Sequence, residues 1–196
     1  MRRIPLWAVW LAGAIPLALL VADTLGDRLG ADPVVRIEHR LGRTALYFVI
    51  ASLCVTPLLR LARINLVRFR RPLGLLAFSY AVLHVAAWVV LDMGLLWGQI
   101  LRDVVKRPYL VFGMAGFAIL AVMAATSADS VIRWLGARRW KALHRAVYAA
   151  VLLGILHWLW AYKIWPDKAL AIGAGVVMIL ALRLPTVGRA LRALRN

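Results

Sequence analysis

Acidic residues and cysteine are scarce in this chain of 196 residues. The 8 Asp and Glu residues are outnumbered by 25 Lys and Arg residues, which gives a formal net charge of +17. The basic residues fall in short clusters between apolar stretches rather than along one polar face. That pattern is typical of loops held at a membrane surface, so we expect no nucleic-acid partner. The single cysteine, Cys54, excludes an intrachain disulfide and a thiolate metal site.

Motifs of nucleotide and zinc chemistry are missing as well. The sequence contains no P-loop, no dinucleotide fingerprint and no H-E-x-x-H motif. It therefore offers no nicotinamide- or flavin-dehydrogenase domain.

Apolar residues, in contrast, dominate the chain. They make up 64% of it, and the mean hydropathy is +0.81. A water-soluble domain could not bury that much apolar surface, so we expect an all-α polytopic membrane bundle, with residues 1–196 as a single transmembrane domain. Six transmembrane helices are predicted, the first retained rather than cleaved as a signal peptide: 5–22, 44–60, 73–91, 109–125, 143–161 and 168–184.

The basic clusters predict the orientation of these spans. With six spans, both termini share a side with the loops at 60–72 and 126–142, and this side holds most of the Lys and Arg residues. The positive-inside rule therefore places both termini in the cytoplasm. All acidic residues except Asp129 fall on the opposite side. The polar segment 31–40 is expected to form an ordered outer lip.

Two histidines, His84 and His157, lie inside predicted spans. An imidazole in hydrocarbon is costly without a partner, so it is a functional-site hypothesis by default. Both spans run in the same direction, which brings the two imidazoles to similar depth in the outer half of the membrane. Haem iron takes two axial ligands, and facing helices of a bundle commonly supply them. The alternative is a pair of polar residues hydrogen-bonded within the bundle.

The other two histidines are separate from this pair. His144 lies about 20 Å from His157 along an ideal helix, so the two cannot share one iron. It could serve a second haem, a haem propionate or a quinone headgroup near the inner face, where Arg70 and Arg71 are its neighbours on the third span. A plain interfacial histidine is the alternative. His39, in the outer segment, is expected to be solvated.

Several short motifs resemble the ferric-reductase-like transmembrane family, and they occur in order along nearly the whole chain. They are GADP (30–33), GRTAL (42–46), TPL (56–58), RRPLGL (70–75) leading to His84, RPYL (107–110), RWKALHRAVY (139–148) and, after His157, WAYK (160–163).

The resemblance implies a six-helix, b-haem protein of the bacterial inner membrane. In the branch of the family that it matches, such a subunit passes electrons from the respiratory quinone pool to a periplasmic, molybdenum-containing methionine sulfoxide reductase. The haem-linked histidines carry over to His84, His144 and His157, and a cofactor-linked arginine to Arg70, with Arg71 beside it. One haem, or two, is implied, and FMN is implied by resemblance alone.

These observations predict an electron-transfer subunit rather than a complete reductase. Because the chain lacks a dehydrogenase domain, its electrons must come from a membrane carrier or another protein. The outer surface, 23–43, 92–108 and 162–167, is predicted to dock the partner. Two alternative functions stay open. A small transporter would carry charged residues at the centres of its spans, and the predicted spans have none; an assembly or anchor subunit would pack the histidines without a cofactor.

Overall fold

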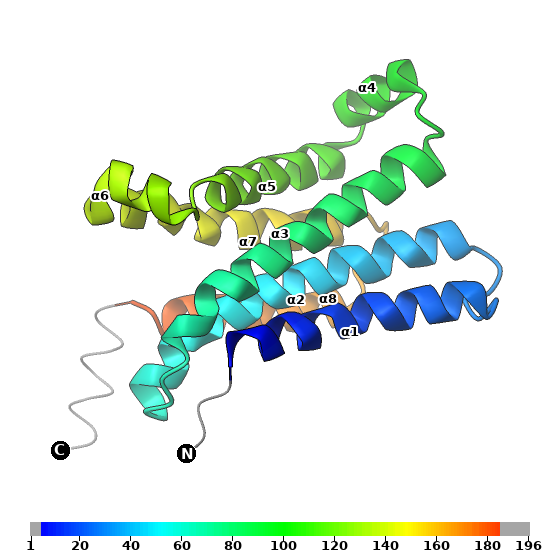
Figure 1. The fold of residues 1–196 in the computed structure, drawn as a ribbon. Helices are drawn as coiled ribbons and strands as arrows, with labels where there is room; N and C mark the ends of the chain where they lie inside the picture. The colour runs from blue at the N-terminus through cyan, green and yellow to red at the C-terminus, as the bar shows by residue number, and fades with distance from the viewer. Residues whose placement is uncertain (1–4, 185–196) are drawn as a thin grey trace.

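Long helices lie side by side in the computed structural model, which describes residues 5–184 (Figure 1). Residues 1–4 and 185–196, and with them the predicted location of both termini, lie outside the described residues. The long helices are α1 (Leu6–Leu25), α2 (Pro33–Leu61), α3 (Arg70–Ala87), α5 (Pro108–Ala125), α7 (Val147–Trp160) and α8 (Asp167–Ala181). Shorter elements are η1 (Val67–Phe69), the π-helical turn η2 (Trp88–Asp92), α4 (Trp97–Lys106), α6 (Asp129–Leu143) and η3 (His144–Ala146). The described chain contains no strand, in agreement with the all-α prediction.

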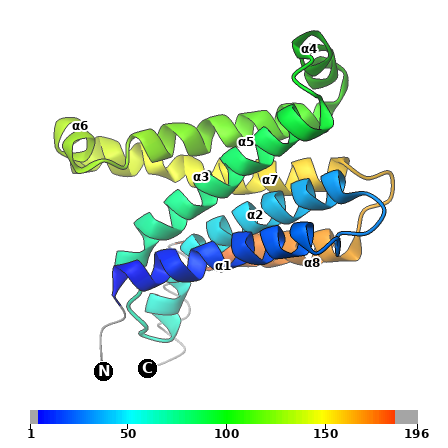
Figure 2. The ribbon, with the colours of Figure 1, turned by 45° about the vertical axis from the view of Figure 1, so that its right-hand side comes forward.

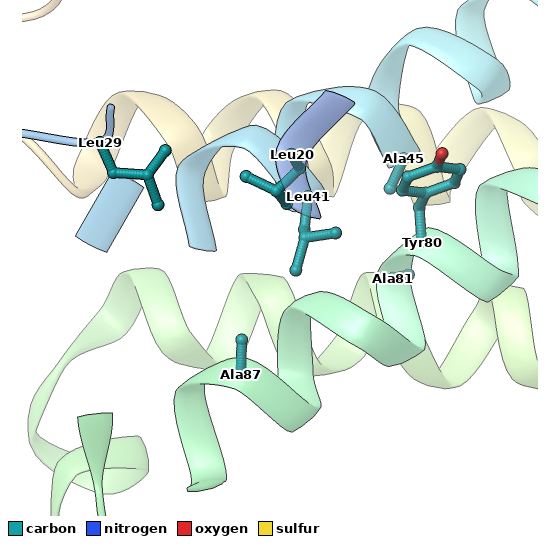
Figure 3. Close-up of a cluster of buried hydrophobic side chains, with 7 residues drawn as sticks. All are labelled: Leu20, Leu29, Leu41, Ala45, Tyr80, Ala81 and Ala87. Carbon is teal, nitrogen blue, oxygen red and sulfur yellow. The ribbon is translucent and has the colours of Figure 1, made fainter. Parts of the chain in front are cut away.

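Helix packing divides the bundle into two layers that meet at α3. Helix α2 packs against α3 and α5 packs against α7, while α3 also contacts α5 and α8 contacts both α2 and α7 (Figures 1 and 2). One apolar cluster joins α1, α2 and α3 through Leu20, Leu29, Leu41, Ala45, Tyr80, Ala81 and Ala87 (Figure 3). A second joins α2, α3, α7 and α8 around Leu53, Val151 and Val176.

A hydroxyl group couples α1 to α3 within the first cluster. Tyr80 donates a hydrogen bond to the Gly13 carbonyl at 2.7 Å and accepts one from the Leu17 N–H at 3.0 Å. Those two backbone groups are i and i+4 partners in a regular helix, so the Tyr80 hydroxyl is inserted into the hydrogen-bond ladder of α1.

Helix α2 begins earlier than predicted. The Asp32 side chain accepts a hydrogen bond from the Val35 N–H at 3.2 Å, and Pro33 occupies the first helical position. Both features start a helix. The segment 31–40, expected as a separate outer lip, therefore forms the first turns of one helix that continues to Leu61.

Two short helices occupy segments that were predicted as loops. Helix α4 lies between α3 and α5, and α6 occupies most of the predicted loop 126–142, with a kink at Gly136, whose φ of 72° favours glycine. The predicted span 143–161 is correspondingly shorter, because a 3₁₀ turn at 144–146 separates α6 from α7. Neither short helix has the long apolar run by which the spans were recognised.

Five helical segments are long and apolar enough to cross a membrane: Leu6–Leu25, Pro33–Leu61, Val67–Asp92, Pro108–Ala125 and Asp129–Trp160. The chain is therefore a multi-pass membrane protein. Helix α8, which matches the predicted sixth span at 168–184, has 15 residues. A transmembrane helix needs about 17–25 residues, so the sixth span stays a prediction.

Candidate haem site

The two histidines predicted to lie at similar depth face each other in the structure. His84 comes from α3 and His157 from α7, and their ring centroids are 6.0 Å apart with ring planes at 73°. Helix α3 packs mainly against α2 and helix α7 mainly against α5, so the histidine pair lies between these two helix pairs.

Backbone carbonyl groups fix the orientation of both imidazoles. His84 Nδ1 lies 3.0 Å from the Glu38 carbonyl oxygen on α2, and His157 Nδ1 lies 2.7 Å from the Tyr109 carbonyl oxygen on α5. A carbonyl only accepts hydrogen bonds, so each Nδ1 carries the proton and donates. The neutral tautomer then leaves the Nε2 lone pair of each ring available to a metal, the usual arrangement of a metal-binding histidine.

A glycine makes room for each imidazole. A Cβ atom at Gly113 would lie 2.7 Å from His157 Nδ1, and a Cβ atom at Gly42 would lie 3.2 Å from His84 Nδ1. Any side chain at Gly113 would therefore push His157 away from the Tyr109 carbonyl. These two glycines were not predicted as site residues, although Gly42 opens one of the motifs noted above.

A cavity of about 380 Å³ opens between α2, α3, α5 and α7 beside the histidines. Its deeper wall is apolar and includes Leu46, Val49, Phe117, Leu120 and Ala150. Its mouth is polar and charged, with Glu38, His39, Arg43, Asp92, Arg107, Tyr109 and Tyr162. The cavity thus combines an apolar interior with charged groups at one edge.

Two arginines, Arg43 and Arg107, lie at this mouth. Arg107 forms an ion pair with Asp103 at 3.3 Å and donates a hydrogen bond to the Tyr109 hydroxyl at 3.2 Å. This hydrogen bond raises the pKa of Arg107, so the residue stays charged. Neither Arg107 nor Arg43 was predicted as a site residue, because their place at one cavity mouth depends on how α2, α5 and α7 surround the cavity.

The residues that line the cavity fit a haem. Imidazole nitrogens bind first-row metals at about 2 Å, so two imidazoles on opposite sides of one metal have ring centroids about 6 Å apart; the observed separation is 6.0 Å. Among the described residues, no three His, Cys, Asp or Glu side chains gather as a metal site. Haem iron requires only two protein ligands. The apolar wall suits a macrocycle, and cations at the mouth suit its propionates.

His144 is not part of this cavity. It lies in the 3₁₀ turn η3, where its ring stacks on Trp140 with centroids 4.0 Å apart. Its Nε2 lies 3.3 Å from the Thr126 hydroxyl, and the Trp140 indole donates to the Thr126 carbonyl at 2.9 Å. No second imidazole faces it within residues 5–184. The structure therefore does not bring His144 together with His84 and His157.

The predicted arginines also lie away from the cavity, at the end of the bundle where α2 ends and α3 begins. Arg70 donates a hydrogen bond to the Thr56 hydroxyl, and Arg71 forms an exposed ion pair with Asp129 at 2.6 Å. His39, expected to be solvated, is exposed at the opposite end, where its ring lies 5.9 Å from that of Tyr162 at the cavity mouth.

Comparison with known proteins agrees with this picture. Residues 41–155 match the family described as "Ferric reductase like transmembrane component". The chain is 43% identical over 179 residues to proteins from Brucella ovis, Brucella abortus and Brucella melitensis, a match that covers 91% of this chain and 81% of each relative. Each of these relatives is named "Protein-methionine-sulfoxide reductase heme-binding subunit MsrQ".

The fold and the site define a class: a helical membrane protein that presents two oriented imidazoles to one apolar cavity. Within that class, the chain belongs to the MsrQ branch of the ferric reductase-like transmembrane family. The match to the ferric reductase-like family begins at residue 41 and ends at residue 155. It therefore includes His84, His144 and the two glycines beside the imidazoles, but not His157.

Proposed function

We propose that this chain is a haem-binding membrane subunit that delivers electrons to a methionine sulfoxide reductase. It takes electrons from the respiratory quinone pool and passes them to the periplasmic, molybdenum-containing reductase MsrP. The observation that carries the proposal is the pair His84 and His157, each with Nδ1 held by a backbone carbonyl and Nε2 left available. The name of the Brucella relatives, heme-binding subunit of a protein-methionine-sulfoxide reductase, supports the haem and the reductase partner.

The histidines, the apolar wall and the arginines of the site would have different roles toward a bound haem. A bound b-type haem supplies reversible one-electron chemistry at its iron. His84 and His157 would hold that iron, while the carbonyls of Glu38 and Tyr109 keep the two rings in place. The apolar wall excludes water and so favours the less charged redox state. At the mouth, Arg43 and Arg107 would attract the carboxylates of such a cofactor.

The proposed orientation makes electron delivery outward. The cavity mouth lies at the end of the bundle formed by residues 26–32, 92–107 and 161–166. The basic residues of the opposite end favour the cytoplasm, with six spans and both termini on that side of the inner membrane. The mouth then faces the periplasm, where the predicted docking surface at 23–43, 92–108 and 162–167 surrounds it. The donor quinone and FMN belong to this proposal through the family resemblance.

Purification of the full chain from membranes tests the proposal. We expect a Soret band and an α-band that appears on reduction, with one haem per chain. Reduced quinol should reduce this haem, and purified MsrP should reoxidise it. A colourless but folded protein would refute haem binding. A haem that quinol reduces and MsrP fails to reoxidise would instead support another ferric reductase-like electron carrier.

A matched variant separates the site from its surroundings. His39→Ala removes an imidazole at the cavity mouth, whereas His84→Ala removes one that faces its interior. We expect the His39 variant to retain its haem spectrum. If the His39 variant lost the haem and the His84 variant kept it, the assignment of the ligands would be wrong.

A further inference from the structure

Two arginines converge on one threonine at the end of the bundle opposite the cavity mouth. Arg70, at the start of α3, and Arg183, just after α8, both donate hydrogen bonds to the Thr56 hydroxyl of α2, the latter at 2.7 Å. Arg183 also donates to the Tyr148 hydroxyl of α7 at 2.9 Å, and its guanidinium carbon lies 5.4 Å from the Tyr148 ring centroid. These four residues form what we call the Thr56 cluster.

Among the described residues, no carboxylate balances the charge of the Thr56 cluster. Two guanidinium ions share hydroxyl partners, which are neutral. In residues 5–184, the ion pairs use Arg28, Arg40, Arg71 and Arg107, so no carboxylate of this part of the chain pairs with Arg70 or Arg183. The Nε atoms of both arginines are buried and have no hydrogen-bond acceptor there. Adjacent, partly buried cations repel each other and are costly unless an anion joins them.

The position of the Thr56 cluster indicates what kind of anion it meets. The cluster lies where α2, α3, α7 and α8 meet at one end of an apolar bundle, close to the exposed apolar side chains Leu58 and Leu184. In a bundle that spans the bilayer, a cluster at this end would lie near the lipid phosphates. Guanidinium groups match phosphate oxygens in shape and bind them through paired, charge-assisted hydrogen bonds. Basic pockets between transmembrane helices commonly bind lipid headgroups.

We propose that the Thr56 cluster is a phosphate-binding site. Arg70 and Arg183 hold the oxyanion, while Thr56 and Tyr148 fix the two guanidinium groups at the correct separation. The phosphate belongs either to the headgroup of an anionic lipid or to a soluble phosphate. The site is distinct from the haem cavity and stands whether or not the proposed electron-transfer function is correct.

The test uses the full-length protein in nanodiscs of phosphatidylcholine alone or with added phosphatidylglycerol. Thermal unfolding and native mass spectrometry measure stabilisation and bound lipid. Phosphatidylglycerol should stabilise the wild type and remain bound to it, whereas Arg183→Gln should weaken this binding about tenfold, as expected for the loss of one charged hydrogen-bonding partner. Arg145→Gln removes an exposed charge near the same end and should leave the binding unchanged.

A second arm identifies the source of the phosphate. Inorganic phosphate is titrated into the phosphatidylcholine nanodiscs. Stabilisation there that is lost in Arg183→Gln would support the site and assign a soluble ligand, and stabilisation by phosphatidylglycerol alone would assign a lipid. If Arg183→Gln does not fold, Arg70→Gln replaces it. Equal responses of the wild type and the arginine variant to both ligands would overturn the proposal, as would an equal loss in Arg145→Gln.

Discussion

The two places where this chain positions imidazoles inside or beside its bundle are built differently. His84 and His157 each donate Nδ1–H to a backbone carbonyl, lie against a glycine and face a shared cavity. His144 instead uses Nε2 to contact Thr126 and stacks on Trp140. A ring whose Nε2 is already engaged has less to offer a metal. The comparison teaches that histidines of one bundle can differ in which ring nitrogen is engaged: Nδ1 in His84 and His157, which leaves Nε2 available, and Nε2 in His144.

Removal of either member of the cavity pair should have the largest effect. In His84→Ala or His157→Ala, the iron loses one of its two strong ligands, so we expect loss of the low-spin haem spectrum and of most bound haem. Absorption spectra and haem-to-protein ratios of the purified variants measure this. Full haem content with an unchanged spectrum in both variants would show that His84 and His157 are not haem ligands and do not differ from His144 in this respect.

Substitution of the glycines should have a graded effect. In Gly113→Ala the new Cβ atom would lie 2.7 Å from His157 Nδ1, whereas in Gly42→Ala it would lie 3.2 Å from His84 Nδ1. We therefore expect partial haem loss and a shifted reduction potential, larger at Gly113. Gly74→Ala is the control, because nothing lies within 4 Å of its Cβ position. It should leave the haem spectrum unchanged and increase helix stability by up to about 1 kcal/mol. A greater haem loss in Gly74→Ala than in Gly113→Ala would contradict the steric argument.

His144→Ala should spare the haem and cost modest stability. The variant loses ring stacking on Trp140, an interaction of about 0.5–1.5 kcal/mol, so its melting temperature should fall slightly. Haem content and spectrum should match those of the wild type. Loss of about half of the haem from a folded variant would instead assign a second haem to His144.

The smallest effect is expected for Tyr109→Phe. The backbone carbonyl of residue 109 orients His157, and the variant keeps it; only the hydroxyl that accepts a hydrogen bond from Arg107 is removed. We expect an unchanged haem spectrum and a stability loss of about 1 kcal/mol or less, measured by thermal unfolding. A Tyr109→Phe variant that loses its haem would show that the side chain, not the carbonyl, positions the imidazole.

The pairing of His84 with His157 could be predicted from the sequence, because the depth of a residue in a membrane helix follows from its distance to charged residues at the helix ends. The carbonyl anchors and Gly113 could not, because they depend on which neighbouring helix turns which backbone group toward the ring. Helices α4 and α6 were missed for another reason: short polar helices lack the long apolar run that identifies a span. The break at 144–146 was hidden because the apolar pattern continues through it.

The insertion of the Tyr80 hydroxyl into α1 has a consequence for how the protein is assembled. During synthesis α1 emerges long before α3, and at that time the Gly13 carbonyl and the Leu17 N–H can bond to each other, as i and i+4 groups do in a regular helix. When α3 arrives, its tyrosine replaces that single bond with two. The Gly13 carbonyl and the Leu17 N–H therefore each have a hydrogen-bond partner both before and after α3 packs against α1.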